Sequence, residues 1–253
     1  MLQKFTNRYV ISAVALFAVF AVVFSAFGIL GGDLFALAEG IKVWDGSADT
    51  KFEGSGTAKD PYKITSAEEL YGFVTTYAGS EIKQISDQLY FVLTNDIYLN
   101  DVTKSDWTEN APRKWHSVSK TAFNTNTAQG FRGHFDGNGY TVFGLYYASP
   151  SSTSYVMGLI PVTSGNAVIT NVNLRHSYAQ NPSNCDMILG GIVGAVNKNA
   201  VYKGSFVSKY NASTVTVTKC VVDESVDFGS VTYGYTGGLV GAVRGSNLVV
   251  EYC

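Results

Sequence analysis

The chain contains the phrase LGGIVGAV at residues 189–196 and repeats it with small changes as TGGLVGAV at residues 236–243. A third relative, GLIP, stands at 158–161. A short strand-like segment follows each phrase, and these segments are ITNV (169–172), VTKC (217–220) and VEYC (250–253). Gly158 lies 33 residues before Gly191, while Gly191 lies 47 residues before Gly238. The polar insertion at 197–214 accounts for the longer interval, so the sequence contains a 33-residue repeat with one interruption.

A repeat of this length indicates units that bury their apolar faces only by stacking on one another. Helical arrays with similar periods need two helices per unit, whereas these units are short Val, Ile and Thr segments broken by Gly and Asn. We therefore predict an all-β fold, a right-handed parallel β-helix (solenoid) in which equivalent residues form ladders along the axis. Val172, Cys220 and Cys253 are predicted to form one inward ladder. The repeated glycines are predicted to give the backbone freedom where each unit bends.

Residues 66–77 carry the one convincing helix signal in the chain after residue 38. Ser66 and Glu69 form a capping box at its start. The apolar residues that share one face of this helix are Leu70, Phe73, Val74 and Tyr77. Open strand edges invite aggregation, so this short amphipathic helix is predicted to cap the N-terminal end of the solenoid. The last strand has no comparable cap, which predicts either a longer protein or another cover for that edge.

The first 38 residues have the pattern of a secretory signal peptide. Lys4 and Arg8 precede a long apolar run at 10–30, and Ala36 and Ala38 stand where a signal peptidase reads small residues. Cleavage after Ala38 is predicted, and an uncleaved membrane anchor is the alternative because the run could span a bilayer. We therefore expect export to the cell surface or the extracellular space. The predicted organisation is a signal at 1–38, a cap region at 39–87 and β-helix repeats at 88–253.

Composition excludes several classes of function. The formal net charge of −2 provides no basic field for nucleic acid. The three cysteines are an odd number, and no CxxC pair or histidine cluster accompanies them, so neither a closed disulfide framework nor a zinc site is predicted. We predict no metal and no cofactor.

The chain resembles a family of secreted bacterial proteins with GLUG-type repeats. The resemblance rests on the segments 54–73 (GSGTAKDPYKITSAEELYGF), 90–99 (YFVLTNDIYL) and 131–145 (FRGHFDGNGYTVFGL), and on GLIP, GIVG and GLVG, in this order. It departs from the family at Pro161, where Gly is usual, and in the long segments 100–130 and 197–214. The resemblance implies a right-handed parallel β-helix in an extracellular, often wall-attached protein. Such a protein is commonly part of a stalk or an adhesin, and no defined reaction is implied.

Catalysis is not predicted, although β-helices also carry polysaccharide lyases and glycosidases. Such sites need paired carboxylates, or a carboxylate with a base or Ca²⁺. The best candidates are Asp96 and Asp136, with His134 on the same side of a strand as Asp136. Both carboxylates stand at turns, where Asp bonds its own backbone, and this structural role is favoured. No catalytic residue is therefore assigned.

Trp107 and Trp115 lie in the polar segment 100–130 and are candidates for stacking on sugar rings. The alternative is that they fold back onto the flank of the helix as a small cluster. The leading functional prediction is a secreted or surface β-helix that acts as an adhesin segment or spacer and presents loops to a host or microbial glycan or a surface protein. The alternatives are a polysaccharide-active enzyme on the same fold and a structural subunit that associates end to end. Contact with a membrane is expected only through an uncleaved signal segment.

Overall fold

The computed structural model describes residues 41–79, 86–103, 112–119, 130–148, 154–180, 186–197, 201–202, 205–206, 214–229 and 233–253. Residues 43–253 form one compact unit, to which the following description applies. The predicted signal segment 1–38 lies outside the described residues. Within these ranges, no helix is both long and apolar enough to cross a bilayer.

The described chain is mostly β-structure, as predicted for the fold class, with one helix, α3 (Ala67–Tyr77). The strands before residue 150 are β1 (Tyr62–Ile64), β2 (Tyr90–Leu93), β3 (Ile97–Tyr98), β4 (Ser117–Ser119), β5 (His134–Asp136), β6 (Thr141–Phe143) and β7 (Tyr146–Ala148). Those between residues 150 and 200 are β8 (Tyr155–Met157), β9 (Ile160–Ser164), β10 (Val168–Thr170), β11 (Asn173–Arg175), β12 (Tyr178–Gln180), β13 (Asp186–Gly190) and β14 (Val193–Asn197). The remaining strands are β15 (Val201–Tyr202), β16 (Ser205–Phe206), β17 (Thr214–Thr218), β18 (Val221–Val222), β19 (Tyr233–Gly237), β20 (Val240–Arg244) and β21 (Asn247–Glu251).

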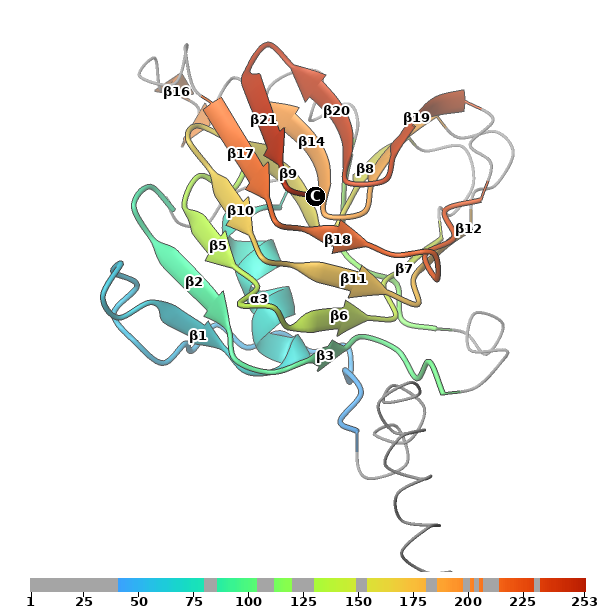
Figure 1. Ribbon diagram of the computed structural model, residues 1–253, viewed down its shortest axis with the longest axis horizontal. Coiled ribbons are helices and arrows are strands. Elements are labelled where there is room, and N and C mark those ends of the chain that lie inside the picture. Colours follow the sequence, from blue (N-terminus) through green and yellow to red (C-terminus); the bar gives the residue numbers. More distant parts are fainter. Residues whose placement is uncertain are drawn as a thin grey trace, which may run out of the picture. The chain divides into compact units, whose positions relative to one another are not determined.

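The strands form parallel sheets to which the chain returns once per repeat (Figure 1). The largest sheet has the order β1-β2-β5-β10-β17-β21, and all of its pairs are parallel. Two further sheets have the orders β18-β11-β6-β3 and β20-β14-β9, and they too are parallel throughout. A fourth sheet, β19-β13-β8-β4, is parallel except for β4, which is antiparallel to β8. Consecutive strands such as β5 and β6 therefore belong to different sheets, and the turns between them are corners rather than hairpins.

The register of the sheets confirms the alignment of the repeats. Val193 pairs with Ile160 on one side and Val240 on the other, which reproduces the two intervals read from the glycines. The corner after β5 repeats as well: Asn138, Asn171, Lys219 and Tyr252 all have positive φ, between 53° and 56°. The segment 197–214, which lengthens one interval, contains the small antiparallel pair β15–β16.

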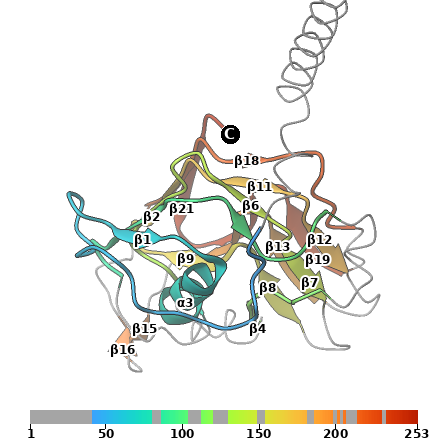
Figure 2. The ribbon, with the colours of Figure 1, turned by 90° about the horizontal axis from the view of Figure 1, so that it is seen from below.

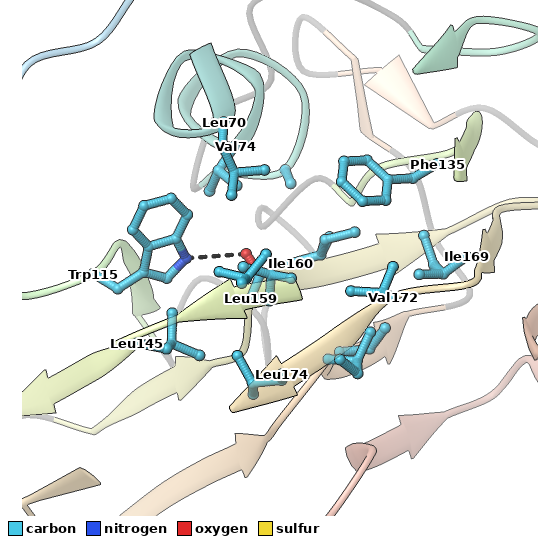
Figure 3. Packing of buried hydrophobic residues seen from close by; sticks show 14 of the residues in the cluster. Leu70, Val74, Trp115, Phe135, Leu145, Leu159, Ile160, Ile169, Val172 and Leu174 are labelled. Carbon is cyan, nitrogen blue, oxygen red and sulfur yellow. Dashed lines mark hydrogen bonds between the residues drawn. The ribbon is translucent and has the colours of Figure 1, made fainter. Parts of the chain in front are cut away.

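Helix α3 packs on the apolar interior between the sheets (Figures 2 and 3). The Ser66 side chain accepts a hydrogen bond from the Glu69 backbone N–H, as the capping box predicts. The Glu69 carboxylate bonds the Thr65 N–H at 2.6 Å, one residue before the expected donor. Phe73 is fully buried, and its ring lies 4.8–5.0 Å from the rings of Phe91, Phe131 and Phe135.

The role predicted for the repeated glycines is wrong. None of Gly158, Gly191, Gly194 and Gly238 has positive φ, so these positions do not need a conformation that other residues avoid. Gly158, Gly191 and Gly194 need space instead, whereas a Cβ atom at Gly238 would meet nothing within 4 Å. A Cβ atom at Gly194 would lie 2.5 Å from the carbonyl oxygens of Met157 and Pro161, which is far inside normal contact. The phrase recurs because neighbouring backbones approach closely at the same point in each layer.

Candidate functional site

The carboxylates of the two acidic candidates accept hydrogen bonds at the corners between sheets. The Asp96 carboxylate accepts a hydrogen bond from the Thr141 N–H at 2.8 Å. The Asp136 carboxylate accepts one from the Asn138 N–H at 2.7 Å and another from the Asn171 side chain at 2.9 Å. The bonds from Thr141 and Asn171 tie one layer to the next, and the bond from the Asn138 N–H is the turn contact that the sequence favoured for Asp136. The Asp96 bond is not local, because its donor lies 45 residues away.

His134 lies on β5, two residues before Asp136, and stacks on Tyr90 of the neighbouring strand. The ring centroids are 4.2 Å apart and the planes are inclined by 7°. Burial lowers the pKa of the His134 imidazole, so the ring is neutral at pH 7. A neutral ring held face to face with Tyr90 is a packing element of the outer face, and the hydrogen bonds of Asp136 are directed to asparagine and backbone partners instead.

Trp115 is not available as a sugar-stacking platform, which corrects that candidate assignment. Its side chain is only 5% exposed, and its indole N–H donates to the Leu159 carbonyl at 3.0 Å (Figure 3). The ring makes edge contacts with Trp44 and with Tyr71 of α3, both at 5.4 Å. The alternative of a cluster on the flank of the helix therefore applies. Trp107 lies outside the described residues.

Aromatic side chains of successive layers form stacks that the sequence analysis did not predict. Tyr98 stacks on Phe143 at 4.6 Å, and Phe143 on His176 at 6.2 Å. Tyr146 and Tyr178 form a second stack at 6.1 Å. Aligning the sequence by repeat could have shown them, because paired residues occupy equivalent positions in successive layers. Within a stack each ring packs on its neighbour, and Phe143 and Tyr146 are each only 5% exposed, so these side chains add packing energy and offer little surface to a ligand.

The described residues contain no group of three or more His, Cys, Asp or Glu side chains that could hold a metal ion. Cys220 and Cys253 are adjacent, with the Cys220 N–H directed at the Cys253 sulfur at 3.4 Å. Burial raises the pKa of the Cys220 thiol to about 11, which makes it an unreactive core group. Cys253 is exposed, and Cys185 lies outside the described ranges.

Exposed apolar side chains gather in the last layer of strands. The large hydrophobic residues that are exposed in the described part of the chain are Val221, Tyr235, Val243, Val250 and Tyr252. All of them lie in or beside β18, β19, β20 and β21, which are the last members of the four main sheets. We call this set of four strands the open end. An apolar patch on a protein surface marks a site of interaction more often than a site of chemistry.

No protein-family model matches the chain, and no curated protein or solved structure matches it either. Its function must therefore be argued from its own residues.

Proposed function

We propose that the chain is a right-handed parallel β-helix of the secreted or cell-surface kind, related to proteins with GLUG-type repeats. It acts as an adhesin segment or spacer that presents loops to a glycan or a protein. The observation that carries the proposal is the in-register parallel pairing of successive repeats in four sheets. Right-handed connections between parallel strands are strongly preferred, which supports the handedness.

A stack of this kind suits a spacer for a physical reason. Each layer is held by backbone hydrogen bonds to its neighbours and by a continuous apolar interior, so the loops between strands can vary without loss of the frame. The polar insertion at 197–214 is an example, because it lengthens one repeat while the register of the strands on both sides is kept.

A polysaccharide-active enzyme has less support. The Asp96 and Asp136 carboxylates accept corner hydrogen bonds, and the His134 ring is stacked on Tyr90. Three residues with structural duties do not provide the acid and base that glycosidic cleavage requires.

The proposed location is tested by expressing the chain with a C-terminal epitope in a bacterial host and determining the cell fraction and the N-terminal residue of the product. We expect a protease-accessible product that begins after Ala38. A product that stays in the cytosol with its first residues intact would contradict export.

The proposed binding role is tested with the exported chain on arrays of glycans and surface proteins. In the test variant a short Gly-Ser linker replaces residues 198–213. The matched control is His134→Ala, which alters only the outer face of the sheet. Loss of binding in the loop variant with retention in His134→Ala is expected. The reverse result would favour chemistry or recognition on the sheet face.

A further inference from the structure

Cys220 and Cys253 occupy the same place in two successive layers. Strands β17 and β21 pair in parallel register up to two residues before the cysteines. Each cysteine then follows a corner residue of positive φ, which is 54° at Lys219 and 56° at Tyr252. The backbone therefore turns in the same way before both cysteines and presents their side chains in the same direction.

The two thiols also make equivalent contacts. Each S–H group donates to the carbonyl oxygen two residues earlier, from Cys220 to Thr218 at 3.4 Å and from Cys253 to Glu251 at 3.3 Å. Each is also directed at a carbonyl oxygen of the layer before its own, at 3.8 and 3.7 Å. The Cys220 N–H points at the Cys253 sulfur at 3.4 Å, so the two residues are in direct contact.

This arrangement is close to the geometry of a disulfide. Neighbouring strands of a sheet lie about 4.8 Å apart, which is inside the range of about 4.4–6.8 Å that a disulfide spans between Cα atoms. The Cβ atoms of a relaxed disulfide are about 3.8 Å apart, so the two side chains must tilt toward each other by about 1 Å. A bond held under this strain is reduced more readily than a relaxed one.

We propose that Cys220 and Cys253, whose thiols are both free in this structure, form a reversible disulfide that joins two successive layers. The oxidant is a disulfide of low molecular weight, such as oxidised glutathione. One protein thiolate attacks this disulfide and releases a first small thiol, and the other protein thiolate then attacks the mixed disulfide and releases a second. Two protein thiols are thereby oxidised to one disulfide, and one small disulfide is reduced to two thiols.

The bond is expected to form while the layers assemble. Burial raises the pKa of the Cys220 thiol to about 11, so little thiolate is present there once the layer is packed. In the unfolded chain the same thiol is exposed and ionises more easily. A chain that folds and is kept in a thiol reductant therefore retains both thiols, whereas a chain that folds in the presence of the oxidant closes the bond.

The closed loop contains one complete repeat. It includes β18, β19, β20 and β21, which are held to the preceding layer by backbone pairing. A link between residues 33 positions apart lowers the entropy of the unfolded chain. Oxidation should therefore raise the urea concentration at which the chain unfolds.

The bond is tested on the full chain, kept in a mild detergent, unfolded in urea with reductant and refolded in reduced and oxidised glutathione at pH 8. Iodoacetamide blocks the remaining thiols before digestion. Trypsin separates the two cysteines into peptides 220–244 and 245–253, while Cys185, which lies outside the described residues, falls in peptide 176–198. We expect 220–244 joined to 245–253, and Cys185 alkylated, in most refolded molecules.

The same glutathione mixture in urea is the control for proximity along the chain. Cys220 is 33 residues from Cys253 and 35 from Cys185, so closing either loop costs nearly the same entropy in the unfolded chain. The ratio of the 220–253 disulfide to the 185–220 disulfide should rise at least about tenfold on folding, because the fold holds the first pair in contact.

Cys220→Val is the matched variant, since Val172 occupies the same ladder position one layer earlier and is fully buried. The wild type should unfold at a higher urea concentration after oxidation than after reduction. The variant should unfold at the same concentration in both states.

Three results would overturn the inference: alkylation of both cysteines in the refolded chain, a disulfide ratio that folding does not change, and a joined peptide that non-reducing electrophoresis assigns to two chains. Only the expectation that such oxidants surround the protein rests on the proposed export. The export test determines the first residue of the product, so its failure and the failure of the disulfide are separate results.

Discussion

Replacing Gly191 by alanine tests why the repeated phrase contains glycine. A Cβ atom at Gly191 would lie 2.4 Å from the carbonyl oxygen of Gly238 in the next layer and 2.8 Å from a methyl group of Val222. The Gly191 N–H donates to that same oxygen at 2.9 Å. The new methyl group can be admitted only if the two backbones move apart, which stretches the hydrogen bond between them.

The cost follows from these contacts. The oxygen must retreat by at least about 0.6 Å to reach a tolerable distance, and overpacking of this kind costs about 1–3 kcal/mol. Weakening one backbone hydrogen bond adds up to about 1 kcal/mol. The lower entropy of the unfolded alanine chain offsets about 0.4–1 kcal/mol. We expect a net loss of about 2 kcal/mol, or roughly 4–8 °C in Tm for a chain of this size.

Gly238 is the matched control because it occupies the same ladder position one layer on. A Cβ atom built there meets nothing within 4 Å, since it faces the open end. Gly238→Ala should therefore unfold within about 0.5 kcal/mol of the wild type. Urea unfolding followed by circular dichroism measures both variants at the same low protein concentration.

Two results would refute the reasoning. If Gly191→Ala unfolds at the urea concentration of the wild type, close backbone approach is not the constraint. If both variants lose the same stability, the glycines serve a purpose common to every layer, such as backbone conformation, and the contact with the next layer is irrelevant.

Four further outcomes are expected. Lys219→Asn should raise the free energy of unfolding by about 1 kcal/mol in urea, because Lys219 has φ +54° at the corner position where Asn171 stands one layer earlier; no gain would exclude strain at this corner. Phe73→Ala should cost about 3–5 kcal/mol in the same assay, since it empties the contact between α3 and the sheets; a loss below 1 kcal/mol would mean that the helix is dispensable. A thiol reagent at pH 8 should label Cys253 quickly and Cys220 only on unfolding. The buried thiol has its pKa raised from 9.0 to about 11, so the stability that it contributes is complete below pH 9 and is lost as the pH rises through 11; Cys220→Ala should lack this alkaline loss, and an unchanged pH profile would contradict the assignment.

The repeat was readable from the sequence because register is a matter of spacing. Once Gly158, Gly191 and Gly238 are aligned, the intervals between them are the offsets at which strands pair. The helix was readable for a similar reason, because its cap and its apolar face are local patterns at 66–77. Both features depend on residues that are near one another in sequence or separated by a fixed period.

Other features depend on contacts between residues whose separation in the sequence follows no repeat or local pattern. The Asp-Gly and Asn-Gly pairs at 136–139 mark a turn, but whether it joins two strands of one sheet or two sheets is decided by what lies above and below it. Trp115 is buried because its indole N–H reaches Leu159, 44 residues away, and a polar neighbourhood in the sequence suggested exposure instead. The crowding at Gly194 likewise involves backbone atoms of a different layer.

Repetition specifies the interior of a layered fold, but it cannot specify an end, because an end is where the next repeat is missing. The first end is built from sequence outside the repeat: the bridges at Val43 and Glu53 and helix α3 each supply a different substitute for a layer. At the open end the strands belong to the repeat, and the valines at positions that are buried in the preceding layer are exposed. Neither the repeat pattern nor the structure of a single layer shows that these valines are exposed. The exposure of Val243 and Val250 therefore has to be learned from the structure, because the same ladder positions are buried one layer earlier.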